Sequence, residues 1–339
     1  MLKRAFAALA VVLMGALSAP AWSQVKDIRW GTGPVGSVGH KSLVVLADFL
    51  NHAMPKYRIT VLPTPGAVTT VKGYATGEYD AFYGSDIAFH ELATDSLRFK
   101  GFKSHIKRMP VQSFWAFTIE GTLGILARNQ DKYKSWSDLE GKRVFTCPLP
   151  FDVRAQLERA LAALDIKFEY VQLDLSTAGS QLASGAIDAM CIYTGAEKTP
   201  APWITEASLA ADWAALNPSA AEIAKLEKQK FSVVELDPSV FKRDVHVKKV
   251  VELPFYFGFD VGLEIPAEDV YQMLKLIEQH APELARADSG FAQIAQNMAG
   301  FQRRGVESSW DLVPIHPGLA RYMREKGVWE TKWDGRIAK

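Results

Sequence analysis

Strand-type and helix-type segments alternate along the chain, and this alternation is the strongest limit on its fold. A short β-type run at Val25–Trp30 is followed by an amphipathic helical stretch at Lys41–His52 and a second β-type run at Arg58–Leu62. A strand, a helix and a strand in this order form a βαβ unit with parallel strands. The pattern resumes with β-type runs at Arg143–Phe145 and Ala189–Tyr193. We therefore expect an α/β protein of two lobes, each a mainly parallel sheet flanked by helices.

A five-residue echo favours a common architecture for the two lobes. The segment GEYDA at residues 77–81 recurs as GAIDA at residues 185–189. Glycine suits the left-handed residue that ends a helix, and aspartate favours the turn into the next strand. Because such turns favour these residues anyway, two unrelated turns remain the alternative. We expect Asp80 and Asp188 to serve the turns rather than a ligand.

Length and segment order suggest how the chain divides between the lobes. A chain of 339 residues predicts about two domains. We assign residues 24–120 to the first lobe, 121–262 to the second, and 263–339 to a return into the first. A helical stretch is expected over Trp203–Lys230 and a buried strand over Phe255–Leu263. Strands that cross twice between lobes predict a hinge and a cleft between the lobes.

The first residues resemble an export signal. Lys3 and Arg4 precede an apolar run at residues 5–17, and the small residues Ala21 and Ser23 stand where a signal peptidase would recognise them. A membrane anchor needs about 20 apolar residues, and this run is shorter. We predict a signal peptide over residues 1–23 and a periplasmic product.

Charge and histidine spacing narrow the classes of partner. Lys+Arg total 39 and Asp+Glu total 38, a net charge of +1, whereas a nucleic-acid binder usually carries a basic excess. We therefore expect no nucleic-acid partner. The seven histidines lack the close pairing of metal ligands, so we expect no metal, and no cofactor is expected.

Cys147 and Cys191 are the only cysteines, and each lies at a β-type run expected in the same sheet. An oxidising compartment would permit a disulfide between them. Two buried free thiols are the alternative, because neighbouring strand positions often present poor disulfide geometry.

A glycine-rich loop, GTGPVG at residues 31–36, lies between the first strand and its helix. It matches the dinucleotide pattern GxGxxG, but the second strand ends without the acidic residue that binds the ribose. Glycines let the backbone approach a ligand, and the amides of a helix start favour an anion. We expect a carboxylate-binding loop, with Thr32, Ser37 and His40 nearest to the ligand.

Four motifs together point to one known family: GTG after the first strand, GEYDA leading into Ser85 and Asp86, the GAIDA echo, and PIHPGLARY at residues 314–322. In this combination the chain resembles the TAXI-type solute receptors of TRAP transporters. The resemblance implies a two-lobed periplasmic binding protein that is not an enzyme. Such a receptor captures a small organic acid, often glutamate or a related carboxylate, and passes it to an ion-driven membrane permease. We expect a monomer or a weak dimer, in which His316 is structural.

The loops of that family are only partly present. Residues 38–40 are VGH where Thr-Tyr-Tyr is common, and residues 66–70 are GAVTT where Gly-Ser-x-x-Asn is expected. Residues 151–153 are FDV in place of Ser-Gly-Thr, followed by Arg154. Fewer hydroxyl donors and an added carboxylate disfavour a second acid group on the ligand. We expect a monocarboxylate or an amino acid rather than a compact dicarboxylate, unless Asp152 merely caps its helix.

The solute is expected to contact both lobes. Arg154 is predicted to pair with its carboxylate, because the planar guanidinium can hold both oxygens. Asp86 either lines the cleft or caps the helix that follows it. The predicted ligand-binding residues are Thr32, Gly33, Ser37, His40, Gly66, Ala67, Ser85, Asp86, Phe151, Asp152, Arg154, Thr194 and Gly195.

Two other functions remain open from the residues alone. Ser37, between a strand and a helix, is a candidate nucleophile of a secreted serine hydrolase, although residue 35 is valine and the GxSxG form is absent. The other alternative is a periplasmic sensor ectodomain that binds a solute without transporting it.

Overall fold

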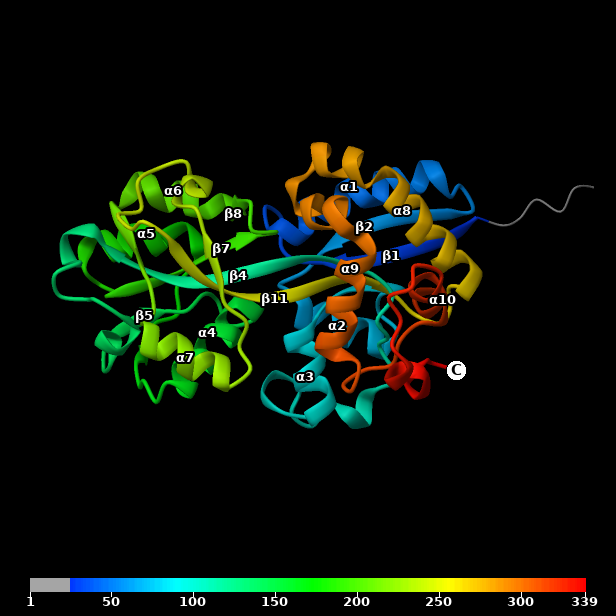
Figure 1. Ribbon diagram of the computed structural model, residues 1–339, viewed down its shortest axis with the longest axis horizontal. Helices are drawn as coiled ribbons and strands as arrows, with labels where there is room; N and C mark the ends of the chain where they lie inside the picture. Colours follow the sequence, from blue (N-terminus) through cyan, green and yellow to red (C-terminus); the bar gives the residue numbers. More distant parts are fainter. Residues whose placement is uncertain (1–24) are drawn as a thin grey trace, which may run out of the picture.

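Two long strands join two groups of helices and strands. The computed structural model describes residues 25–339, so the predicted signal peptide lies outside the described residues. Figure 1 shows β4 (Trp115–Leu126) and β11 (Val250–Val261) running between the two groups. We call the group with the N-terminal strand lobe 1, and the group that lies between β4 and β11 along the chain lobe 2.

One sheet runs through both lobes, in the order β2-β1-β3-β11-β4-β7-β5-β6. In lobe 1, β1 (Lys26–Thr32) pairs in parallel with β2 (Tyr57–Pro63) and with β3 (Ala81–Ser85). β11 pairs antiparallel with both β3 and β4. The two long strands therefore carry hydrogen bonds continuously from one lobe to the other.

Lobe 2 repeats the parallel arrangement. β5 (Arg143–Phe145) pairs in parallel with β6 (Glu169–Tyr170) and with β7 (Ala189–Gly195), and β7 pairs antiparallel with β4. Three short strands lie off this path: β8 (Thr199–Pro200) on β7, β9 (Trp213–Leu216) on β4 and β10 (Val234–Leu236) on β11. The expected α/β fold, two lobes with a mainly parallel sheet in each, is confirmed.

Helices cover both faces of the sheet, as Figure 1 shows. None of the helices within residues 25–339 is long and apolar enough to cross a membrane. The helix bounds are α1 Val38–Ala53, α2 Ala67–Thr76, α3 Asp86–Thr94, α4 Asp152–Ala163, α5 Leu175–Ser184, α6 Pro202–Ala210, α7 Ala220–Lys228, α8 Ala267–Ala287, α9 Ala292–Ser309 and α10 Pro317–Glu325.

The helical stretch expected over Trp203–Lys230 is wrong in its middle. Between α6 and α7 the chain forms a strand, β9 (Trp213–Leu216), which pairs antiparallel with β4. A short apolar run fits a buried strand as well as a helix, and the partner strand decides between them. The predicted lobe boundaries stay predictions; residue 120 lies inside β4 and residue 262 directly follows β11.

The two echo segments make the same contacts in both lobes. Gly77 and Gly185 end α2 and α5 in the left-handed conformation. The Asp80 carboxylate accepts a hydrogen bond from the Arg29 amide at 3.0 Å, and the Asp188 carboxylate accepts one from the Arg143 amide at 3.1 Å. The turn role predicted for both aspartates is confirmed.

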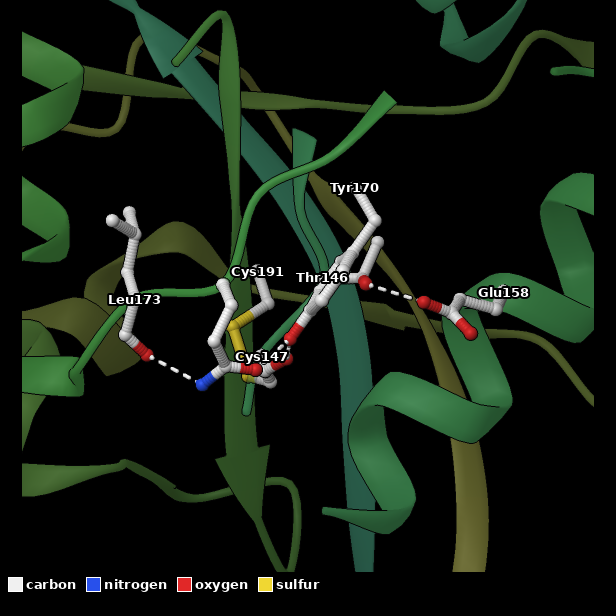
Figure 2. Close-up of a disulfide and its surroundings, with 7 residues drawn as sticks. Thr146, Cys147, Glu158, Tyr170, Leu173 and Cys191 are labelled. Atoms are coloured by element: carbon white, nitrogen blue, oxygen red, sulfur yellow. Dashed lines mark hydrogen bonds between the residues drawn. A yellow bond between two sulfur atoms is a disulfide. The ribbon is translucent and has the colours of Figure 1, made fainter. Parts of the chain in front are cut away.

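A disulfide joins Cys147 to Cys191 inside lobe 2, so the bridge is favoured over two free thiols. Figure 2 shows it between the end of β5 and β7, with Tyr170 beside it. The Tyr170 hydroxyl donates to the Cys147 carbonyl oxygen at 3.1 Å. The bridge therefore fixes the segment that leads from β5 into α4.

Candidate functional site

A small cavity of about 40 Å³ lies between the two lobes. Tyr83 and Phe257 line it from lobe 1, Tyr193 and Phe151 from lobe 2, and Ile119 from the strand that joins them. This mixture of a mainly apolar wall and a few polar groups is typical of pockets for small molecules. The complete lining is Gly33, Pro34, Ser37, Val38, Gly39, Gly66, Ala67, Tyr83, Ile119, Phe151, Asp152, Val153, Tyr193 and Phe257.

Three helices begin at this cavity, two from lobe 1 and one from lobe 2. The start of α1 is capped by Ser37, whose Oγ accepts a hydrogen bond from the His40 amide at 3.2 Å. α2 begins after Gly66 and α4 after Phe151, and no side chain caps either helix. The first amides of a helix lack partners within it and carry partial positive charge. The cavity can therefore hold an anion through backbone N–H groups.

The glycine-rich loop brings α1 close to the aromatic wall. Gly36 has a φ of +83°, which favours glycine, and a Cβ on Gly39 would lie 2.5 Å from the Tyr83 ring. Tyr83 in turn stacks on Phe257, with ring centroids 4.4 Å apart. Burial raises the pKa of the Tyr83 phenol well above its usual value. Tyr83 thus presents an uncharged ring to the cavity.

Asp152 is the one charged side chain in the cavity lining, and it is already paired. Ser85 Oγ donates to Asp152 Oδ2 at 2.5 Å, and Arg98 Nη1 lies 2.6 Å from Asp152 Oδ1. Arg98 also donates to the Glu91 carboxylate, with Nε 2.8 Å from Oε2. Ser85 and Arg98 belong to lobe 1 and Asp152 to lobe 2, so these contacts connect the lobes. We call Ser85, Arg98 and Asp152 the cleft latch.

Six predicted residues, Gly33, Ser37, Gly66, Ala67, Phe151 and Asp152, line the cavity. Two other predicted residues support neighbouring contacts. Ser85 binds Asp152 and caps α3 by accepting from the Ala88 amide at 2.9 Å. A Cβ on Gly195 would lie 2.8 Å from a methyl group of Val38, so lobe 2 approaches α1 closely there.

Arg154, the predicted carboxylate partner, does not line this cavity. Its Nε donates to Glu158 Oε1 at 2.6 Å, and its guanidinium lies 3.8 Å from the centre of the Tyr170 ring. Figure 2 shows Thr146 donating to the same Glu158 carboxylate. Because side chains two residues apart on a helix point in different directions, Arg154 cannot share the orientation of Asp152.

Asp86, Thr32, His40 and Thr194 also lie outside the lining. Asp86 borders a separate polar groove with His90, and burial raises its pKa to about 7. The cap of α3 is Ser85, so the alternative that Asp86 caps this helix is wrong. Thr32 is fully buried, while Thr194 is hydrogen-bonded to two glutamates.

Tyr83, Tyr193 and Phe257 line the cavity but are not among the predicted contacts; a signal that could have found them is an aromatic residue near a strand end. Their meeting depends on the pairing of β11 with β3, which opposes Phe257 to Ser85 and Phe259 to Tyr83. Val38, Gly39 and Val153, which also line the cavity near the starts of α1 and α4, are not among the predicted contacts either.

The position of Ser37 does not favour the serine hydrolase alternative. Its oxygen accepts from the backbone at the start of α1, and no histidine ring is hydrogen-bonded to it among residues 25–339. The residues that the structure describes also contain no cluster of three or more potential metal ligands.

His316, expected to be structural, is fully buried at the start of α10. Its Nδ1 accepts from the Gly318 amide at 3.1 Å, and its Nε2 lies 3.1 Å from the Ile265 carbonyl oxygen. The structural role is confirmed, because the ring connects α10 to the segment before α8.

Several solved structures are similar to this chain. The periplasmic aliphatic sulphonate binding protein SsuA from Escherichia coli is 14% identical, with 92% of this chain and 97% of that chain covered and a TM-score of 0.48. The alkanesulfonate-binding protein SsuA from Xanthomonas axonopodis pv. citri, bound to MOPS, is 16% identical, with 88% and 90% covered and a TM-score of 0.47. A putative L-cystine ABC transporter from Listeria monocytogenes is 15% identical, with 78% and 97% covered and a TM-score of 0.46.

The family comparison covers most of the sequence. The model of the NMT1-like family matches residues 30–327, from the first strand to the end of the last long helix. The match includes the glycine-rich loop, both echo segments and all three helix starts at the cavity. The chain therefore belongs to the NMT1-like family.

Proposed function

We propose that this chain is a periplasmic solute-binding protein. It captures a small monoanionic solute with an apolar body between its lobes and delivers it to a membrane permease. The resemblance to TAXI-type receptors favours a permease of the TRAP type, and the predicted signal peptide supports export. The protein acts without catalysis and as a monomer.

The convergence of three helix starts on one apolar cavity carries this proposal. Backbone amides of α1, α2 and α4 offer an anion site that draws on both lobes. No lysine, arginine or histidine lines the cavity within the described residues. A second acid group would therefore meet no counter-charge, which favours a monocarboxylate over a dicarboxylate.

The pairing of Asp152 refines the class of solute. Its carboxylate is held by Ser85 and Arg98, so it has no free charge for an amine on the solute. The aromatic rings of Tyr83, Tyr193 and Phe257 instead favour an apolar body. Since both lobes supply amides, a bound carboxylate stabilises the arrangement in which the lobes are in contact.

A thermal-shift screen of residues 24–339 tests the proposal. Monocarboxylates of increasing apolar size, dicarboxylates and amino acids are compared at one concentration, because a ligand of the folded state raises its apparent stability. We expect the largest rise in melting temperature with an apolar monocarboxylate. A larger rise with a dicarboxylate would contradict the charge argument.

A cavity-filling variant supplies the site-specific control. Ala67 is buried at the cavity, whereas Ala221 is exposed on α7. We expect Ala67→Phe to abolish the solute-induced shift, because the ring occupies the space of the solute, and Ala221→Phe to retain it. Equal shifts in both variants would place the solute elsewhere. Ester hydrolysis by the wild type that Ser37→Ala removes would favour the hydrolase instead.

A further inference from the structure

Two buried carboxyl groups lie on the strands that join the lobes. Glu120 on β4 and Glu252 on β11 are both fully buried. Thr194 on β7 lies between them, with its Oγ1 2.7 Å from Glu120 Oε2 and 2.6 Å from Glu252 Oε2. Within residues 25–339 neither glutamate forms an ion pair. We call Glu120, Thr194 and Glu252 the hinge triad.

The number of protons decides how these contacts are made. A threonine hydroxyl has one hydrogen to donate, yet Thr194 Oγ1 is within hydrogen-bond distance of two carboxyl oxygens. Glu120 Oε2 also accepts from the Glu197 amide at 3.0 Å, so this oxygen is an acceptor. Thr194 can therefore donate to only one of these two carboxyl groups, and the other must carry a proton and donate it to Thr194.

The surroundings of the hinge triad contain no compensating positive charge. The charged group that acts on both carboxyls is Glu197, in the turn between β7 and β8, and it repels them. From α9, Gln293 contacts Thr118 and donates to Glu197, and it is uncharged. Burial raises the pKa of Glu120 to about 8. Burial and the neighbouring Glu120 raise the pKa of Glu252 well above its usual value.

The same turn connects the hinge triad to lobe 1. Glu197 accepts from Gln293 Nε2 at 3.2 Å, and the Thr199 hydroxyl lies 2.6 Å from the Ser289 hydroxyl. Both Gln293 and Ser289 belong to lobe 1, as Figure 1 shows for the start of α9. The turn that supplies an amide to Glu120 is therefore also a contact between the lobes.

We propose that the hinge triad is a proton-binding site, occupied by at least one proton while the lobes are in contact. Bending β4 and β11 at this point would admit water and let the carboxyl groups ionise. The ionised triad would hold two like charges on adjacent strands, which opposes return to the closed arrangement. Solute capture would thereby be linked to proton uptake, whatever the solute is.

The direction of the pH effect follows from the raised pKa values. Both carboxyl groups bind protons more tightly in the folded protein than in the unfolded chain. Their effect on stability is therefore most favourable below the ordinary glutamate pKa and is lost as the pH rises toward about 8. Each proton held only by the folded state changes the unfolding equilibrium constant about tenfold per pH unit in this range.

Urea unfolding of the mature protein without solute, at pH 7 to 8.5, tests the site. Most of this range lies above the pKa of about 7 to which burial raises Asp86 and Asp260. We expect wild-type stability to fall with pH, and Glu252→Gln to fall less steeply by about tenfold per pH unit in the unfolding constant, since its amide donates to Thr194 without titrating. The control Glu235→Gln, at a half-exposed residue on β10, should keep the wild-type slope.

Equal pH slopes in the wild type and Glu252→Gln would overturn the proposal. If that variant fails to fold, infrared difference spectra between the wild type and Glu120→Gln at pH 7 provide the second measurement. A protonated-carboxyl band that is lost or shifted in the variant supports the site, because the remaining carboxyl group has changed its partner, and an unchanged protonated-carboxyl band overturns it. Neither result depends on solute binding, so each is distinguishable from a failure of the proposed function.

Discussion

The cleft latch and the hinge triad are two buried acidic sites that handle charge in opposite ways. Asp152 of the cleft latch is matched by Arg98, with 2.6 Å between Oδ1 and Nη1. Glu120 and Glu252 of the hinge triad share a hydroxyl and no cation. The first site remains charged and needs its partner from the other lobe, whereas the second avoids charge by holding a proton.

The two sites also differ in the parts of the fold that they join. The cleft latch joins groups from opposite lobes, so it forms only when the lobes meet. The hinge triad lies within strands of one sheet, so it responds to bending of those strands. Asp152 of the cleft latch lines the cavity, whereas no member of the hinge triad does.

Among the variants that test this comparison, the one that removes the cation of the cleft latch should have the largest effect on the free energy of unfolding. In Arg98→Met, Glu91 and Asp152 keep buried charges without a partner, and we expect a loss of about 3–5 kcal/mol in the free energy of unfolding. Urea denaturation at pH 7 measures the loss. Arg303→Met, which removes an arginine whose side chain is 54% exposed, should lose far less. Equal losses would show that the latch contributes no more than a surface pair.

Removing the shared hydroxyl of the hinge triad should have a smaller effect on the free energy of unfolding. Thr194→Val keeps the shape of the side chain but leaves two buried carboxyl groups without their common partner. We expect a loss of about 1–3 kcal/mol in the free energy of unfolding at pH 6. Thr194→Ser retains the hydroxyl and should recover most of it. A serine variant as unstable as the valine variant would place the effect in packing rather than in hydrogen bonding.

The smallest effect on stability is expected from a substitution at Arg154, which the sequence predicts to contact the ligand. Its pair with Glu158 joins residues one helical turn apart, so Arg154→Met should lose about 0.5 kcal/mol in stability. Calorimetric titration with the solute found in the screen should give unchanged affinity. Binding weakened tenfold or more would return Arg154 to the site and contradict the absence of basic side chains from the cavity lining of the described residues.

The parts of the fold that depend on local sequence were predictable. The alternation of strands and helices, and the turns at Asp80 and Asp188, follow from residues close together along the chain. β9 was missed because its apolar run becomes a strand only through pairing with β4. For the same reason, the sequence could not decide whether Cys147 and Cys191 form a disulfide, since the bond depends on how β7 and the end of β5 face each other.

The candidate site was predictable as loops but not as side chains. The helix starts at Ser37, Gly66 and Phe151 lie at the cavity. These positions could be predicted, because glycines and strand ends mark them in the sequence. Arg154 was misplaced because the direction of a helical side chain depends on where its helix begins. The burial of Glu120 and Glu252 could not be predicted from the sequence. Each is a single acidic residue in an apolar run, and its burial depends on strands that are distant along the chain.

The order of the central strands also bears on how the chain is made. β3 lies next to β11 in the sheet, so the edge of β3 at residues 81–85 stays unpaired until residues 257–261 have been synthesised. Lobe 2 is continuous along the chain between these strands and can form first. During synthesis, the half-built first lobe therefore exposes an unpaired strand edge, which favours association with other chains. A chaperone that binds the nascent chain would protect that edge until β11 has been made.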